Sequence, residues 1–392
     1  MIAENPPLRH VFSKSAQDTG HQADALAGAL YAYATNINDL SPLIPVVVRI
    51  AHKHAAHGIT GEQYGIVGTY LIRTLCEYFG DAFTEELKVA WYNAYWQLAK
   101  IFIDQEAKLY AQAAWTGFQA FQVAKVEKES AVISSFYLEP VHGSQLSMKP
   151  FMPGQYLTVR LWVEEIGAYQ LRHYSLSDAP NSSQYRISVK REPGLSTSSP
   201  SNTSHPGFIS NLLHEQYKEG SIIEVAHPYG DFLLSTSSTP TPTPVVFISA
   251  GVGVTPLLAM FNSLTGTSSS NERKITWIQG SRNSAEQAFA AHVRNVVGKS
   301  GGNVKAVFFH SRPGEGEVPV KEGNGEGDYD FAGHVDLEKV PREELFLGEG
   351  DEGAEYYVCG PGEFMASVAK KLGEMGVQSG RVHMEVFGAG GI

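Results

Sequence analysis

The chain has 392 residues and a hydrophobic content of 43%, which is enough for two or three domains with their own cores. Its net charge of −11 argues against a general binder of nucleic acids or anionic membranes, and its two cysteines exclude a disulfide framework and fit a reducing compartment. No signal peptide is evident. The weakly polar run 244–262 is interrupted by glycines and a proline, so it predicts strand, turn and helix rather than a membrane span.

Residues 1–115 are predicted to form a helical domain. Alanine-rich amphipathic runs are separated by short breaks at Ser41-Pro42, Gly58 and Gly80-Asp81, which is typical of helices joined by tight turns.

Within this region, the stretch "RIAHKHAAHG" places three histidines at 52, 54 and 57. An apolar stripe of Val47, Ile50 and Ala51 continues at i+7 with His54. His52 lies about 200° around the helix from His54 and is expected to face solvent, and His57 lies at a frayed end before a glycine terminator. The pattern therefore directs His54 at an apolar interior, where an imidazole needs a partner, and a metal is one possible partner.

Residues 116–233 change character. Alternating runs such as "YLTVRLWV" and "YRISVKR" predict the strands of an antiparallel barrel or sandwich. "RHYSLS" (172–177), the basic strand end "VKRE" and the helix start "GFISNLL" (207–213) can together offer a cation, a hydroxyl and helix amides to a pyrophosphate.

Residues 244–392 alternate strand and helix, which predicts a parallel, doubly wound sheet. "ISAGVGVTP" (248–256) is a strand that runs into a glycine turn and a helix, either a second pyrophosphate site or an ordinary strand-to-helix turn. "YVCGPGEFM" closes the last predicted strand. Three low-complexity stretches are predicted to be flexible loops or linkers: "GLSTSSPSNTSHP", "STSSTPTPTP" and "PGEGEVPVKEGNGEGD".

Five motifs of these two regions, "RHYSLS", "GFISN", "GVGVTP", "CGP" and the terminal "EVFG", resemble the ferredoxin-NADP reductase superfamily in order and spacing. The resemblance implies an FAD site and a nicotinamide nucleotide site. The implied FAD contacts are Arg172, Tyr174 and Ser175, with Gly207, Ile209 and Ser210 at its pyrophosphate. The nucleotide would be held by Gly251, Gly253, Thr255 and Pro256, with Phe387 near the isoalloxazine where the nicotinamide docks. Ser281 and Arg282 suit a 2′-phosphate and hint at NADPH, although Arg282 is nearly as well explained as a surface residue.

The helical region in turn resembles the globin domain of flavohemoglobins, on "RIAHKHAAHGI", "EQYGIVG" and "FIDQEAKLY". The resemblance implies that His54 is the proximal haem ligand and that Tyr64 and Glu106 hydrogen-bond its other nitrogen. A carboxylate behind the imidazole would enrich the iron in electrons and favour O–O chemistry over carriage. On the opposite haem face, the resemblance implies that Phe12 packs against the haem ring and that Gln22 and Leu26 line the distal pocket. It also places Lys53 at the haem edge or against the reductase.

The fold that follows is an all-α globin domain (1–115), an antiparallel β-barrel FAD domain (116–233) and an α/β doubly wound NAD(P)-binding domain (244–392). The implied activity is that of a nitric oxide dioxygenase: oxidation of nitric oxide to nitrate at one haem b, dependent on O2 and NAD(P)H, with electrons passing through one FAD. A monomer in the cytoplasm, or partly in mitochondria, is expected, with no nucleic-acid or membrane partner. The alternatives are a haem-based oxygen-binding or sensing protein with its own reductase, and an NAD(P)H flavoreductase with a compromised haem domain.

One departure from the family affects the expected activity. "ENPPLRHVFSKS" resembles a segment that family members reach only after two helices, so roughly thirty residues are expected to be missing from the globin domain. Those helices carry a tyrosine that donates a hydrogen bond to bound O2. Such a bond is worth about 1.5–3 kcal/mol, so its loss predicts roughly ten- to a hundredfold weaker O2 retention, with easy loss of haem and slow turnover of nitric oxide.

Overall fold

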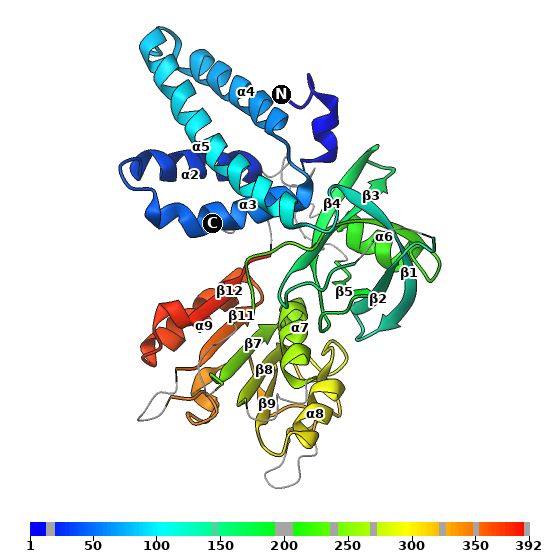
Figure 1. Ribbon diagram of the computed structural model, residues 1–392. Coiled ribbons are helices and arrows are strands. Elements are labelled where there is room, and N and C mark those ends of the chain that lie inside the picture. Colours follow the sequence, from blue (N-terminus) through cyan, green and yellow to red (C-terminus); the bar gives the residue numbers. More distant parts are fainter. Residues whose placement is uncertain are drawn as a thin grey trace.

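The structure is a computed structural model that describes residues 1–12, 20–143, 146, 148–192, 207–235, 242–266, 273–320, 327–347 and 353–387. Helices, an antiparallel sheet and a parallel sheet follow one another along the chain and stack from one end of the molecule to the other (Figure 1). The low-complexity stretch 194–206 lies outside the described residues, as do parts of the other two, so the prediction of flexible loops stays a prediction.

The helical region begins with a short 3-10 helix and contains four α-helices. Their bounds are η1 Pro6–His10, α2 His21–Thr35, η2 Ser41–Leu43, α3 Ile44–His57, α4 Gly61–Phe79, η3 Gly80–Ala82 and α5 Glu85–Gln112. All three predicted breaks separate helices. Gly58 ends α3 with a φ of 71°, a left-handed conformation that glycine adopts without steric cost.

The helices gather around an aromatic core that lies between α3, α4 and α5. Tyr64 on α4, Tyr95 and Phe102 on α5, and Tyr33 on α2 are buried there beside Ala51 of α3. The caps are local: Thr60 and Gln63 form a capping box at the start of α4, and the Thr84 hydroxyl accepts from the Leu87 amide at the start of α5.

The second region is an antiparallel sheet that curls into a barrel. Its elements are β1 Phe118–Lys128, β2 Ile133–Pro140, β3 Tyr156–Val163, β4 Ala168–Ser175, β5 Tyr185–Lys190, α6 Phe208–Gln216 and β6 Ile222–Ala226. The strand order is β4-β3-β6-β1-β2-β5, and an antiparallel bridge between Leu176 and Ile187 brings the two outer strands together. Trp115, in the segment that leaves α5, is buried in the core of this barrel, so the connection between the two regions is anchored.

The third region is a six-stranded sheet in which every pair of neighbours is parallel, in the order β10-β9-β8-β7-β11-β12. Its elements are β7 Val245–Ala250, η4 Gly251–Gly253, α7 Val254–Thr265, β8 Ile275–Ser281, α8 Ala290–Lys299, β9 Val304–His310, β10 Phe331–Ala332, η6 Leu337–Lys339, β11 Glu355–Cys359, α9 Gly362–Glu374, η7 Ser379–Arg381 and β12 Val382–Glu385. Separate apolar cores cover its two faces. The doubly wound pattern was predicted, but strands β10 and β12 were not.

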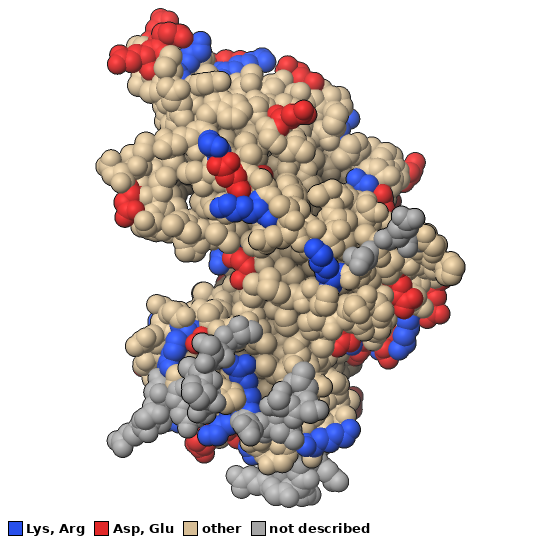
Figure 2. Space-filling view, in the orientation of Figure 1, with Lys and Arg blue, Asp and Glu red and all other residues tan. Residues whose placement is uncertain are grey.

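The surface carries both signs of charge without segregating them on the visible face. Figure 2 shows acidic and basic side chains interspersed there, and a surface hollowed between α2 and α3 on one side and β12 and α9 on the other. Within the described ranges, no helix combines the length and the apolar character needed to cross a membrane.

Candidate functional site

Three side chains from three helices meet at one imidazole. His54 lies on α3, Tyr64 on α4 and Glu106 on α5. The His54 Nδ1 atom is 2.9 Å from Glu106 Oε1 and 2.7 Å from the Tyr64 hydroxyl, which donates to the same carboxylate oxygen at 2.5 Å. Glu106 is only 2% exposed. It is therefore a buried hydrogen-bond acceptor and not a solvated carboxylate of a helix surface.

Two tyrosine hydroxyl groups hold the side chains of this triad in place. The Tyr95 hydroxyl donates to the Tyr64 carbonyl oxygen at 2.6 Å, which holds the backbone that carries the Tyr64 ring. Burial, reinforced by the negative Glu106, raises the pKa of Tyr64 far above its usual value. The Tyr64 hydroxyl therefore stays protonated and acts as a donor at every physiological pH.

The donor set of this triad fits a haem iron. An imidazole that donates its Nδ1 proton to a carboxylate keeps the lone pair on Nε2, which is the atom that binds a metal. Among the residues that the structure describes, His54 Nε2 has no hydrogen-bond partner. The arrangement leaves one nitrogen of His54 oriented by the protein and the other free to ligate.

The predicted distal residues lie on a separate segment. Gln22 and Leu26 are one turn apart on α2, and Phe12 follows η1. The Gln22 Oε1 atom is buried and has no partner within the described ranges, whereas Leu26 is 37% exposed. The structure thus provides an unpaired amide oxygen on α2 but does not enclose Leu26.

Strand β4 carries the predicted flavin contacts on both of its faces. Successive side chains of a strand alternate, so Arg172 and Tyr174 share one face and Ser175 lies on the other. Arg172 Nη1 donates to the Leu171 carbonyl oxygen at 2.7 Å, and burial lowers the pKa of this arginine. The structure therefore groups Arg172 with Tyr174 and separates the Ser175 side chain from them.

Two residues that sequence reasoning missed lie on the Ser175 face. The rings of Tyr156 and His173 stack with centroids 4.5 Å apart, and both the Tyr156 hydroxyl and His173 Nε2 are buried without a partner among the described residues. Buried polar atoms are nearly always paired, so these two fit a bound polar ring such as a flavin. His173 lies inside "RHYSLS", but only its neighbours in that motif were predicted to contact FAD.

The predicted pyrophosphate loop is a helix start. Gly207 is the N-cap of α6, and the Ser210 hydroxyl donates to the Gly207 carbonyl oxygen at 3.1 Å. Ile209 is 1% exposed, so its side chain belongs to the barrel core. The groups that this loop offers to an anion are therefore the amides of the first turn of α6.

The glycine turn after β7 is built by close backbone packing. A Cβ atom at Gly253 would lie 2.2 Å from the Cys359 carbonyl oxygen of β11, so the turn requires glycine there. Thr255 is 2% exposed and its hydroxyl donates to the Val252 carbonyl oxygen at 3.0 Å, and Pro256 is also buried. Of the four predicted contacts, Gly251 is exposed, and the other three shape the turn.

The remaining predicted residues lie at the same edge of the parallel sheet. Gly280, directly before Ser281 and Arg282, pairs in register with Ala250 before the turn. The Ser281 hydroxyl is buried with no partner within the described ranges, and Arg282 pairs with Glu286 at 3.1 Å while its side chain is 60% exposed. Phe387, which is 43% exposed, follows β12 at this edge.

Comparisons with known proteins agree with this division of the chain. Residues 1–102 match the family model "Globin", and residues 247–370 match "Oxidoreductase NAD-binding domain". The flavohemoprotein of Bordetella parapertussis is 42% identical over all of this chain and 92% of that protein. The chain belongs to the flavohemoprotein family.

Other flavohemoproteins match over similar lengths. That of Rhizobium meliloti is 40% identical over 99% of this chain and 91% of its own. The crystal structure of a Malassezia yamatoensis flavohemoglobin with bound FAD and heme has a TM-score of 0.79 at 28% identity, covering 99% of this chain and 91% of that one. The predicted family and the predicted three-part fold are confirmed.

The contact between the helices and the barrel of this flavohemoprotein is made by small side chains. Ala55 and Ala56, directly after His54, are 3% and 0% exposed and pack against Tyr156 and Tyr229. Alanines allow α3 to approach β3 closely. The helix that carries the candidate iron ligand therefore lies directly on the strand that carries a candidate flavin contact (Figure 1).

The two other histidines of α3 also contact the barrel. The prediction that His52 faces solvent is wrong, because the barrel covers that side of the helix and the Gly230 amide donates to His52 Nδ1 at 3.1 Å. His57 is not frayed either: its ring centroid lies 4.8 Å from that of His173. Burial lowers the pKa of His57 to about 4, so this interface holds a neutral imidazole.

Charged residues form a further part of the flavohemoprotein interface. Arg49 on α3 pairs with Asp231 of the barrel at 3.5 Å. Lys53 faces the reductase, where its charge interacts with Glu385 at the end of β12. Burial, with a contribution from Asp231, raises the pKa of Glu385 to about 7 although Lys53 opposes the shift. Glu385 was missed because "EVFG" was used only as a family motif.

Proposed function

We propose that this flavohemoprotein is a nitric oxide dioxygenase that oxidises nitric oxide to nitrate with O2 and electrons from NAD(P)H. The observation that carries the proposal is the buried contact of His54 with Tyr64 and Glu106, because a protein that only carries O2 needs no carboxylate behind its ligand. A second support is the reductase part, which is 30% identical to the "Flavohem-like-FAD/NAD Binding Domain of Nitric Oxide Dioxygenase" from Vibrio cholerae, covering 69% of this chain and 98% of that one with a TM-score of 0.55.

Haem, when bound, supplies the iron at which O2 and nitric oxide react, and FAD, when bound, converts a hydride into single electrons. His54 would hold the iron through Nε2. Glu106 accepts the Nδ1 proton and keeps the imidazole electron-rich, and Tyr64 orients both. Gln22, Leu26 and Phe12 would line the distal side of the haem pocket, where Gln22 offers its unpaired amide oxygen.

The flavin is held by the barrel. Arg172, Tyr174 and Ser175 of β4 would contact it near the end of this strand, together with His173 and with Tyr156, which pairs with Ser175. The amides of Ile209 and Ser210 in the first turn of α6 would receive its pyrophosphate, and Gly207 would cap this turn while its own amide donates to the Glu192 carbonyl oxygen. The match to a solved flavohemoglobin that contains FAD and heme supports this assignment.

The nucleotide binds at the edge where β7, β8 and β11 end. The glycine turn with Gly251 and Gly253, shaped by Thr255 and Pro256, receives its pyrophosphate, and Phe387 lies where the nicotinamide approaches the flavin. Ser281 and Arg282 bind the 2′-phosphate of NADPH.

The domain bounds that we propose are 1–115, 116–233 and 244–392, because the chain changes from helix to antiparallel strand to alternating strand and helix at these points. We also propose a monomer that works in the cytoplasm and binds neither membranes nor nucleic acids. The interspersed charges of the visible face support the last two points alone, because nucleic acids and anionic membranes favour a basic patch (Figure 2).

The test is to purify the chain with haem and FAD and to follow the loss of nitric oxide in the presence of NADPH and O2. The expected result is consumption of nitric oxide with formation of nitrate, which stops when O2 or NADPH is omitted. A Glu106→Gln variant should keep haem and react more slowly, because the amide keeps a hydrogen bond but not the charge. Flavin reduction without any nitric oxide consumption would contradict the proposal and favour a simple flavoreductase.

A further inference from the structure

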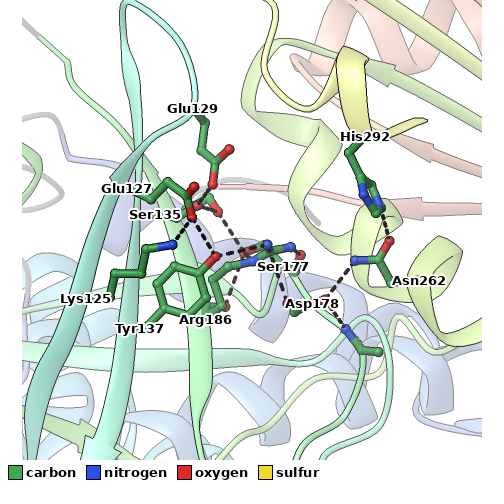
Figure 3. A network of polar contacts seen from close by, with 12 residues as sticks. Lys125, Glu127, Glu129, Ser135, Tyr137, Ser177, Asp178, Arg186, Asn262 and His292 are labelled. Atoms are coloured by element: carbon green, nitrogen blue, oxygen red, sulfur yellow. Dashed lines mark hydrogen bonds and ion pairs between the residues drawn. The ribbon is translucent and has the colours of Figure 1, made fainter. Parts of the chain in front are cut away.

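A chain of hydrogen bonds crosses from the flavin barrel to the nucleotide-binding domain, at a distance from the helical region (Figure 3). Asp178, three residues after Ser175, accepts from Asn262 Nδ2 on α7 at 2.7 Å. The other end of the same amide, Asn262 Oδ1, lies 2.8 Å from Nε2 of His292 on α8. Asn262 therefore uses both ends of its side chain, one toward the barrel and one toward its own domain.

On the barrel side, Asp178 is held in place by its neighbours. Its Oδ1 atom also accepts from the Ala179 amide at 2.9 Å, and its Oδ2 atom lies 3.4 Å from Arg186 Nη1 on β5. The Arg186 side chain is only 11% exposed, and its Nε donates to the Ser177 hydroxyl at 3.2 Å. The Asp178 side chain is 42% exposed, but its carboxylate is held in place by these contacts within the barrel.

A second contact joins the same arginine to the other domain. The Arg186 guanidinium lies 5.5 Å from the ring centroid of Phe289, directly before α8. Phe289 is 8% exposed and has a φ of 65°, a left-handed conformation that is uncommon for a large residue and persists where the surroundings enforce it. The flavin barrel and the nucleotide-binding domain are therefore also joined through Arg186 and Phe289.

The position of this junction links the two proposed cofactor sites. Asp178 continues the strand that carries Arg172 and Tyr174, and Asn262 lies on the helix that begins directly after the Gly251–Gly253 turn. Hydride transfer requires the reacting atoms to be about 3–3.5 Å apart, and a misplacement of about 1 Å can cost about a hundredfold in rate. A change in how the Asp178 segment and α7 meet would therefore move the two proposed cofactor sites relative to each other.

We propose that Asp178, Asn262 and Arg186 are positioning residues for hydride transfer, which fix the nucleotide-binding domain against the flavin barrel so that the two cofactors meet. This inference rests on the proposed function only for its first half-reaction, the reduction of FAD by NAD(P)H. Among the contacts of the described residues, none joins the functional group of any of these three residues to a proposed cofactor-binding side chain. Their effect is on the geometry between the sites.

The experiment is anaerobic stopped-flow reduction of the FAD-loaded chain by NADPH, which separates the rate at saturation from the dissociation constant. Asn262→Asp places a second carboxylate against Asp178, and the saturating rate is expected to fall about tenfold or more at unchanged FAD content. The exchanged pair D178N/N262D restores a donor opposite a carboxylate, and it is expected to reduce its flavin faster than N262D alone. Ser263→Ala is the matched control, because the hydroxyl of this next residue of α7 donates to the Ala259 carbonyl oxygen of its own helix and has no other partner within the described ranges.

A purely structural role would lower the unfolding temperature of N262D and D178N/N262D together and leave the saturating rate of the folded protein unchanged. That result, or an exchanged pair no faster than N262D, would overturn the inference. A wild-type chain whose flavin is reduced by dithionite but not by NADPH or NADH would instead contradict the proposed function, and the inference with it. A normal wild-type rate with no loss in N262D contradicts the inference alone.

Discussion

At the scale of single residues, the three histidines of α3 differ in what their ring nitrogens contact. His54 has one nitrogen held by Glu106 and Tyr64, whereas His52 accepts from the Gly230 amide. We predict that His54→Ala lowers the haem content of the purified protein about tenfold or more, because ligand and orienting bonds are lost together. The absorbance of the Soret band per protein measures this.

His52→Ala serves as the control for that prediction. It should keep its haem and slow the transfer of electrons from reduced flavin to iron, because the interface loses a hydrogen bond. A His54→Ala protein with normal haem beside a His52→Ala protein without haem would reverse the assignment.

Arg282 and Glu286 make a second prediction at this scale. The guanidinium is exposed and paired with Glu286, so both a 2′-phosphate and a carboxylate compete for it. We predict that Arg282→Ala lowers the ratio of NADPH to NADH turnover about tenfold, since a charge-assisted bond is worth about 1.5–3 kcal/mol. Glu286→Gln frees the arginine and should raise the same ratio, and an unchanged ratio in Arg282→Ala would make Arg282 a surface residue only.

At the scale of elements, the glycine turn depends on how closely it packs against β11. Because a Cβ at position 253 would collide with the Cys359 carbonyl oxygen, we predict that Gly253→Ala lowers the unfolding free energy by about 1–3 kcal/mol and slows flavin reduction by NADPH. Dithionite should still reduce the flavin.

Gly298→Ala is the matched control for the turn. Gly298 lies within α8, and a Cβ atom added there would meet no heavy atom within 4 Å, so alanine there should be neutral or slightly stabilising. Equal effects of the two substitutions on flavin reduction would contradict the role assigned to the turn.

The elements were largely predictable because each has its own periodicity. The helix breaks, the strand–turn–helix at 245–265 and the start of α6 at 207–208 follow from local turn chemistry. Strand β12 was missed because its four residues, Val382–Glu385, are half-buried or exposed and do not alternate in burial. A strand of this kind forms only because β11 offers it a parallel edge, and no local pattern records that.

Site residues were predictable from the sequence only where the pattern within a single helix or strand indicates them. The stripe on α3 indicated His54 but not what covers the opposite face, so His52 was assigned to solvent. The partners of His52 and Asn262, Gly230 and Asp178, are 178 and 84 positions away along the chain. Such contacts depend on how domains meet, which the spacing of residues within one element does not encode.

At the scale of the whole molecule, the interface between the helices and the reductase contains a carboxyl group, that of Glu385, whose pKa is raised by burial. Glu385 has a pKa of about 7, against 4.5 for an ordinary glutamate, and it is surrounded by Asp231, Lys53 and Arg49. Between about pH 4.5 and 7 the folded state keeps a proton that the unfolded state has lost, so this group makes the protein less stable as pH rises through that window.

We therefore predict that Glu385→Gln reduces the difference between the unfolding temperatures measured at about pH 5 and about pH 7.5. The amide has no proton to lose, so the variant should gain stability relative to the wild type mainly at the higher pH. Thermal unfolding of both proteins at the two pH values is the measurement. A variant that gains as much at pH 5 as at pH 7.5 would show that Glu385 is not the titrating group.

The two alanines after His54 have a consequence for electron tunnelling. Tunnelling rates fall exponentially with the width of the barrier between donor and acceptor, and the methyl group of Ala56 is fully buried where the helix of the proposed iron ligand meets the strand of a proposed flavin contact. Valine or leucine at position 56 would act as a spacer between α3 and the barrel, and it would press on Tyr156, a proposed flavin contact in the same cluster. The size of residue 56 is therefore expected to control the rate at which electrons pass from the proposed flavin site to the proposed haem site.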